Sequence, residues 1–137
     1  MPGEDALSRH RVLIVDDEES TRLLLARFLS AELGVEAQLA GTCEQALRFA
    51  ENTTYDAILL DLLMPGIGGY EVLREIRRAS ANTATPVLII SQLSDAQTSE
   101  RCLAAGADGF LVKPVERRSL LQAVKALLAA RGKPKKP

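Results

Sequence analysis

Four short runs of consecutive apolar residues constrain the fold of this chain more than any other feature. The runs are Val12–Val15, Ala57–Leu60, Val87–Ile90 and Phe110–Val112. Continuous apolar runs of this length are typical of strands that are covered on both faces, as in a parallel sheet. We therefore predict that these four segments are strands of one parallel sheet, covered on both faces.

A fifth run has a different pattern. Val35, Ala37 and Leu39 alternate with the polar residues Glu36 and Gln38. Alternation with a period of two is typical of a strand with one covered and one exposed face, which fits the edge of a sheet. An edge position places this second strand outside the first, in the strand order 2-1-3-4-5.

Helical patterns occupy the gaps between the strands. The first helix is expected at about 20–33, the third at about 70–79 and the fifth at about 116–130. The second begins with a Thr42-x-x-Gln45 capping box, and the fourth begins near 94–97 and stops before Gly106. In the first helix, we expect one side to carry Leu24, Leu25, Phe28 and Ala31, and the opposite side Arg22, Arg27 and Ser30.

Strand and helix thus alternate five times along the chain, which predicts an α/β fold with right-handed crossovers and helices on both faces of the sheet. A chain of 137 residues with 47% hydrophobic residues is one ordinary domain that needs no disulfide. Cys43 and Cys102 form neither a metal-binding spacing nor a disulfide framework.

Charge and hydropathy narrow the functional classes. The formal net charge of −1 gives no general attraction to nucleic acid or to an anionic membrane. No run of 18 apolar residues is present, and residues 1–11 lack the apolar centre of a secretory signal. We therefore expect a cytoplasmic protein that neither inserts into membranes nor binds nucleic acid directly.

Polar residues follow four of the five predicted strands. Asp16 and Asp17 follow the first strand, Asp61 the third, Ser91 the fourth and Lys113 the fifth. In open α/β sheets, ligands bind beyond the carboxyl ends of the strands, where the strand order reverses. In the order 2-1-3-4-5 the first and third strands are neighbours, so the three acids are predicted to converge there.

Converging carboxylates need a cation. Two of them about 4 Å apart repel by roughly 4 kcal/mol at an effective dielectric constant near 20. A small set of oxygen ligands suits Mg²⁺, which keeps several waters. A metal at this position would neutralise an incoming phosphoryl group, and a carboxylate that attacks phosphorus forms an acyl phosphate. Lys113 would add a fixed positive charge, and the Ser91 hydroxyl could donate a hydrogen bond to a phosphoryl oxygen.

The chain resembles the receiver domain of two-component response regulators. The resemblance rests on Asp16-Asp17, on Asp61-Leu62-Leu63-Met64-Pro65-Gly66, on Ser91 and on Lys113-Pro114. It covers residues 10–130 and leaves 1–9 as an N-terminal tail and 131–137 as a basic tail or linker. It implies a flavodoxin-like fold. The strand-order rule used above was framed partly on this family, so the predicted order is not independent of the resemblance.

The resemblance also implies a role for each site residue. Asp61 is the expected phosphoacceptor. Asp17, Asp61 and the Leu63 backbone carbonyl would bind Mg²⁺ directly, with Asp16 acting through water. Lys113 would pair with the phosphoryl group and form a cis bond to Pro114. Ser91 and Phe110 would be the switch residues, which change the surface formed by the fourth helix, fifth strand and fifth helix.

Four positions bear on how closely the chain follows the usual family pattern. Gln92 stands where the family usually has a small residue, which puts the range of phosphodonors in doubt. Phe110 lacks the hydroxyl of a tyrosine, so any switching would act through packing. Leu63 and Leu93 occupy the two variable positions beside the acyl phosphate and cannot orient an attacking water, so we expect a long-lived phosphorylated form.

Other functions and partners remain open from the sequence. A flavin- or nucleotide-binding module is disfavoured because residues 16–19 are all acidic. A phosphatase that uses Asp61 as nucleophile would need an acid at position 63, which is leucine. The favoured reading is a switch that catalyses only its own phosphorylation and dephosphorylation. A histidine kinase or phosphotransfer protein would phosphorylate it, and an unidentified protein or a second copy would receive the signal. Such a switch could stand alone or be part of a longer regulator.

Overall fold

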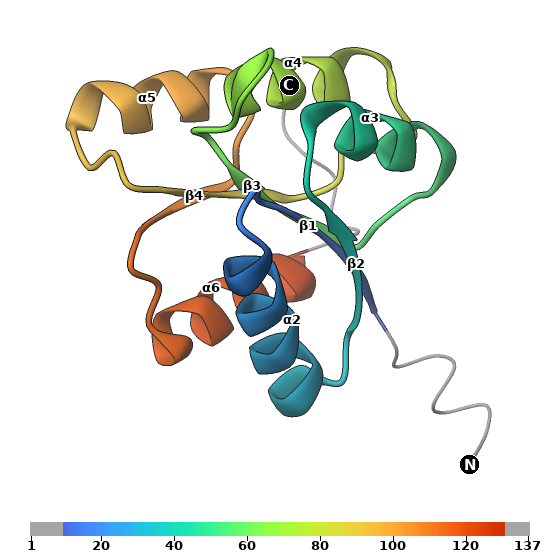
Figure 1. The fold of residues 1–137 in the computed structure, drawn as a ribbon, viewed down its shortest axis with the longest axis vertical. Helices are drawn as coiled ribbons and strands as arrows, with labels where there is room; N and C mark the ends of the chain where they lie inside the picture. The colour runs from blue at the N-terminus through green and yellow to red at the C-terminus, as the bar shows by residue number, and fades with distance from the viewer. Residues whose placement is uncertain (1–9, 131–137) are drawn as a thin grey trace.

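A computed structural model describes residues 10–130 of the chain. Five strands alternate with five helices in this part (Figure 1). The strands are β1 (Arg11–Val15), β2 (Glu36–Ala40), β3 (Ala57–Asp61), β4 (Val87–Ser91) and β5 (Gly109–Val112). The helices are α2 (Glu19–Leu33), α3 (Cys43–Asn52), α4 (Gly68–Ala79), α5 (Ala96–Ala104) and α6 (Arg117–Ala130). The predicted tails, 1–9 and 131–137, lie outside the described residues.

The five strands form one parallel sheet in the order β2-β1-β3-β4-β5, which confirms the predicted fold class and topology. β1 and β3 are direct neighbours, with Val15 opposite Leu60. The acids that follow these two strands therefore start from adjacent positions at the carboxyl edge of the sheet.

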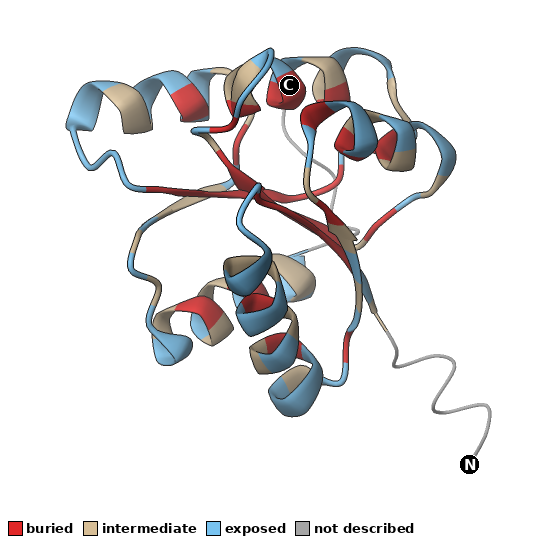
Figure 2. Cartoon of the chain, viewed as in Figure 1, coloured by how far each residue is buried: buried red, intermediate tan, exposed pale blue. Residues whose placement is uncertain are grey.

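The helices cover both faces of the sheet (Figure 1). On one face, α3, α4 and α5 pack against one set of strand side chains, and α2 and α6 pack against the other set. β3 and β4 are buried at every position, as Figure 2 shows. No helix within residues 10–130 is long and apolar enough to span a bilayer.

The two edge strands differ from the central ones. β2 alternates between exposed and more buried residues, as the alternating sequence predicted. β5 is covered less completely than predicted: Phe110 and Leu111 pack against the two opposite core clusters, but three of its residues are only half-buried and Val112 is exposed. β5 pairs only with β4, so one side of the strand has no neighbouring strand in the sheet to cover it.

The predicted faces of the first helix were also partly wrong. In α2 the buried residues are Leu25 and Leu29, whereas Leu24 and Ala31 are exposed. Residues 23–25 are three consecutive leucines, and at 100° per residue they cannot all face the core. The pattern therefore left the orientation of the helix undecided.

The helix caps follow local chemistry. The Thr42 side chain accepts a hydrogen bond from the Gln45 backbone N–H, as the capping box predicts. The Gln45 side chain accepts a hydrogen bond from the Gly41 N–H instead of that of Thr42. At α5 the cap is the carboxylate of Asp95, which accepts from the Thr98 N–H.

Candidate functional site

Three carboxylates meet at the carboxyl edge of the sheet. One oxygen from each of Asp16, Asp17 and Asp61 lies within 4.8 Å of the others. Asp16 and Asp61 are buried, with 1% and 4% of their surface exposed, whereas Asp17 is exposed. The convergence predicted from the sequence is therefore present, and the cluster is open to solvent on the Asp17 side.

Lys113 reaches this cluster from the end of β5. Its Nζ donates to Asp16 Oδ2 at 2.8 Å and to Asp61 Oδ2 at 3.3 Å. The backbone N–H of Lys113 donates to the Ser91 carbonyl, which fixes the lysine beside the end of β4. One ammonium group thus bridges two of the three carboxylates.

The electrostatics of the site are dominated by burial and by this shared lysine. Burial raises the pKa of the Asp61 carboxyl; Lys113 opposes this rise, and the negative charge of Asp16 adds to it. Burial alone would lower the pKa of Lys113, but its hydrogen bond to Asp16 and the charges of both acids raise it. Because Lys113 lies closer to Asp16, it only partly compensates Asp61.

The loop after β3 brings the chain close to Asp61. The Leu63 N–H donates to Asp61 Oδ1 at 3.1 Å and holds the carboxylate in place. Gly69, at the start of α4, has no room for a side chain, because a Cβ would overlap the Asp61 carbonyl oxygen. Residues 64–67 form the connection that leads into α4, and Leu63 itself is exposed.

The two predicted switch residues lie on one face of the sheet. Ser91 is fully buried, and its Oγ accepts a hydrogen bond from the Leu93 N–H. Phe110 is half-buried and packs against the core on the side of α4 and α5. Side chains alternate along a strand, so Ser91 shares this face with Ile89, the partner of Phe110. The Lys113-Pro114 bond is cis, as the resemblance implied.

One residue that contacts the site was missed by the sequence analysis. Arg22 was expected on the side of α2 opposite its apolar residues, yet its Nη1 donates to the Asp16 carbonyl oxygen at 2.7 Å. The guanidinium also lies against Gly41, where an added Cβ would stand 2.8 Å from Nη1. No local pattern signals such a contact, because Gly41 lies in a loop that follows a different strand.

The donor set fits a divalent cation of the Mg²⁺ type. All three side chains offer carboxylate oxygens, with no histidine or cysteine among them, and such ligands suit Mg²⁺ better than Zn²⁺. Two of the three acids are buried and share one ammonium group, so the cluster retains negative charge. A divalent cation would offset that charge.

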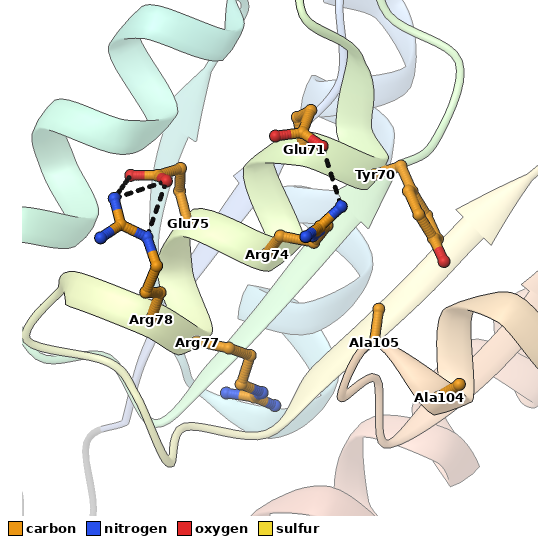
Figure 3. A pocket seen from close by; sticks show the side chains of 8 residues that line it. All are labelled: Tyr70, Glu71, Arg74, Glu75, Arg77, Arg78, Ala104 and Ala105. Atoms are coloured by element: carbon orange, nitrogen blue, oxygen red, sulfur yellow. Dashed lines mark hydrogen bonds and ion pairs between the residues drawn. The ribbon is translucent and has the colours of Figure 1, made fainter.

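Other hollows in the described part of the chain have different chemistry. A cavity of about 450 Å³ beside Lys113 is lined partly by Gln92, Leu24 and Val115. A second, of about 520 Å³, lies between α4 and the end of α5 (Figure 3). The ion pairs of the arginines that line the second cavity are Arg74–Glu71, Arg78–Glu75 and Arg77–Asp108. Because these guanidinium groups are already paired, the second cavity offers little attraction for an anion.

Comparison with known proteins agrees with the fold and identifies the family. The family model of the response regulator receiver domain matches residues 12–125. The response regulator ArlR of Staphylococcus saprophyticus is 38% identical over 121 residues, which cover 86% of this chain and 52% of that protein. The chain therefore belongs to the response regulator receiver domains.

Solved structures give the same assignment. A CheY-like receiver domain protein from Methanospirillum hungatei has a TM-score of 0.82 and 30% identity, covering 89% of this chain and 95% of that one. The receiver domain of a sensor histidine kinase from Pseudomonas aeruginosa, with a magnesium ion in its active-site cleft, has a TM-score of 0.79 and 30% identity. That match covers 88% of this chain and 98% of the other. The chain spans about half the length of the first curated relatives it matches.

Proposed function

We propose that this domain is a phosphorylation-controlled switch in which Asp61 accepts a phosphoryl group with the help of Mg²⁺. The observation that carries the proposal is the meeting of Asp16, Asp17 and Asp61 within 4.8 Å, with Lys113 bridging two of them. Membership of the receiver family and the magnesium ion in a related cleft support it.

The proposed chemistry is transfer to a carboxylate. An Asp61 oxygen attacks phosphorus, the bond from phosphorus to the donor breaks, and an acyl phosphate forms. Bound Mg²⁺ would offset the negative charge of the acids and of the transferred group. Asp17, Asp61 and the Leu63 carbonyl would hold the ion, with Asp16 acting through water. Lys113 would then pair with the phosphoryl group.

The proposed output is a change of surface. The Ser91 hydroxyl would move towards a phosphoryl oxygen, and Phe110 would turn into the space that Ser91 leaves. This change would alter the face formed by α5, β5 and α6. A histidine kinase or a phosphotransfer protein would supply the phosphoryl group in the cytoplasm, and a downstream protein or a second copy would bind the altered face. The domain would catalyse only its own phosphorylation and dephosphorylation.

Incubation with a small phosphodonor and Mg²⁺ tests this assignment. We expect the intact mass to increase by one phosphoryl group, in a linkage with the alkali and hydroxylamine lability of an acyl phosphate. The increase should require Mg²⁺ and should be absent from Asp61→Asn. If the mass stays unchanged, or if Asp61→Asn gains the same group, the assignment of Asp61 is wrong.

A further inference from the structure

The Asp17 carboxylate differs from its two neighbours in how it is held. Asp16 uses both carboxylate oxygens: Oδ1 accepts from the Glu18 N–H at 2.9 Å, and Oδ2 accepts from Lys113. Asp61 is likewise held by Leu63 and Lys113. Within residues 10–130, no hydrogen bond or ion pair holds the carboxylate of Asp17, which is exposed. Its position therefore depends on the backbone that carries it.

Arg22 holds that backbone. The carbonyl of Asp16 belongs to the peptide group that leads into Asp17, and Arg22 Nη1 donates to it at 2.7 Å. The Asp16 N–H donates to the Ala40 carbonyl at 3.1 Å on the other side. Because a peptide group is planar, fixing the carbonyl also fixes the direction in which the chain enters Asp17.

Gly41 provides the space for this contact. The Arg22 guanidinium lies so close to Gly41 that a Cβ would stand 2.8 Å from Nη1 and 3.2 Å from Cζ. A methyl group at position 41 would therefore displace the guanidinium from the Asp16 carbonyl, although the side chain of Arg22 would remain intact.

We propose that Arg22 is a positioning residue for the metal site: it orients the peptide before Asp17 and thereby aims the Asp17 carboxylate at the cation. This inference rests on the proposed function, because it assumes that the three acids bind Mg²⁺. Groups that orient metal ligands commonly change metal affinity 10- to 100-fold when they are removed. We expect Arg22→Ala to weaken Mg²⁺ binding about tenfold.

The direction of the change in Mg²⁺ affinity distinguishes a positioning role of Arg22 from the effect of its charge. Arg22 carries a positive charge beside an acidic cluster, so removal of the charge alone would strengthen the binding of a cation. Loss of orientation would weaken it. A fall in Mg²⁺ affinity in Arg22→Ala therefore cannot come from the change in charge.

The test is Mg²⁺ titration by calorimetry on the wild type, Arg22→Ala, Gly41→Ala and the double variant. Arg27→Ala is the matched control, because Arg27 is exposed on the same helix. We expect weaker binding in both single variants, no further loss in the double variant, and wild-type affinity in the control. Metal-free melting temperatures show whether each variant is folded.

Each outcome bears on one proposal. If the wild type gives no heat with Mg²⁺, the proposed function fails at the metal site. If the wild type binds Mg²⁺ and folded Arg22→Ala binds it equally well or more tightly, only the positioning role is overturned. The same conclusion follows if the losses from Arg22→Ala and Gly41→Ala simply add, because Gly41 would then act independently of Arg22.

Discussion

The two ends of the parallel sheet bury similar polar groups but satisfy them differently. At the amino end, Asn82 is almost fully buried and its amide makes hydrogen bonds to Ala50, Thr53, Tyr55 and Thr85. At the carboxyl end, Asp16 and Asp61 are almost as deeply buried, yet they share one ammonium group. The buried amide at the amino end therefore has neutral partners, while the buried carboxylates at the carboxyl end outnumber the ammonium group that they share.

Two arginines, one at each end of the sheet, show the same contrast. Arg77 donates to the carbonyls of Gly106, Asn82, Thr83 and Thr85 and forms an ion pair with Asp108. Arg22 at the opposite end makes a bond to one carbonyl, beside acids whose own partner is Lys113. A buried polar group without a matched partner lowers stability. The contrast indicates that the amino end stabilises the fold and the carboxyl end is kept ready for a ligand.

The largest expected effect is at the amino end. Asn82→Ala removes the amide donor to the Ala50 and Thr53 carbonyls and the acceptor for the Tyr55 N–H. We expect unfolding free energy to fall by about 3 kcal/mol, equally with and without Mg²⁺, in urea denaturation. Asn52→Ala, which removes one exposed hydrogen bond, should change little. A small loss in Asn82→Ala would mean that the amino end is not the stabilising one.

The second expected effect concerns Lys113, whose ammonium group Asp16 and Asp61 share. Lys113→Gln leaves Asp16 and Asp61 without their ammonium partner, so the metal-free protein should lose about 2 kcal/mol of stability. Mg²⁺ should restore more stability in this variant than in the wild type, because more negative charge remains to be offset. Thermal melts with EDTA or Mg²⁺ measure both effects, with exposed Lys125→Gln as control. An equal gain from Mg²⁺ in the variant and the wild type would contradict this account.

The third substitution, Asp61→Asn, should raise the stability of the metal-free protein, whereas the first two should lower it. The pKa of the Asp61 carboxyl is raised above its ordinary value of 3.8, chiefly by burial. The folded state therefore binds this proton more tightly than the unfolded state, and stability is lost as pH rises through the folded pKa. Asp61→Asn removes that loss of stability. Without metal at pH 7, the variant should therefore melt a few degrees above the wild type, which corresponds to about 1 kcal/mol.

The pH dependence sharpens this test. The gain in Asp61→Asn should shrink as the pH is lowered from the raised pKa towards 3.8, because the wild-type carboxyl is then protonated as well. Melting curves between pH 3.5 and 7 in EDTA measure it. Exposed Glu51→Gln controls for the removal of one negative charge. A variant that melts below the wild type at neutral pH would show that Asp61 is adequately compensated by Lys113.

The sequence predicted the central strands and the charged residues that follow the strand ends. The apolar runs of β3 and β4 have one physical cause, burial on both faces, and the acids and Lys113 follow strand ends whose positions the topology fixes. β5 was correctly predicted as a strand but is less buried than expected, because an edge strand can be as apolar as a central one and composition does not reveal the missing neighbour.

Two sets of contacts between distant segments, those of Asn82 and of Arg22, could not be predicted from the sequence. Asn82 lies 32 residues from Ala50, and its hydrogen bonds depend on how two loops meet. Arg22 was assigned by helical periodicity, which locates its face but not the reach of a long side chain to Asp16. The placement of the acids and of Lys113 could be predicted because strand order fixes it, whereas the contact of Arg22 with the backbone of Asp16 could not.

The smallest expected effect is on the lifetime of the phosphorylated form. Leu63 and Leu93 are exposed at the carboxyl end, with 49% and 38% of their surface accessible, and neither can orient a water molecule for attack on the acyl phosphate. A side chain that accepts a proton or hydrogen bond from water can do so. We expect Leu63→Asn and Leu93→Gln each to speed the loss of phosphate severalfold, equivalent to about 1 kcal/mol in the barrier.

Loss of phosphate from the purified, phosphorylated protein in Mg²⁺ measures this rate. Leu23→Gln is the matched control, because Leu23 is also an exposed leucine but lies on α2. Slower loss in the polar variants would contradict the expectation. Unchanged rates would also contradict it, because they would mean that water reaches the acyl phosphate without help from these positions. Faster loss confined to the Leu63 and Leu93 variants would extend the contrast between the sheet ends, since exposed apolar residues at the carboxyl end would then protect the acyl phosphate on Asp61.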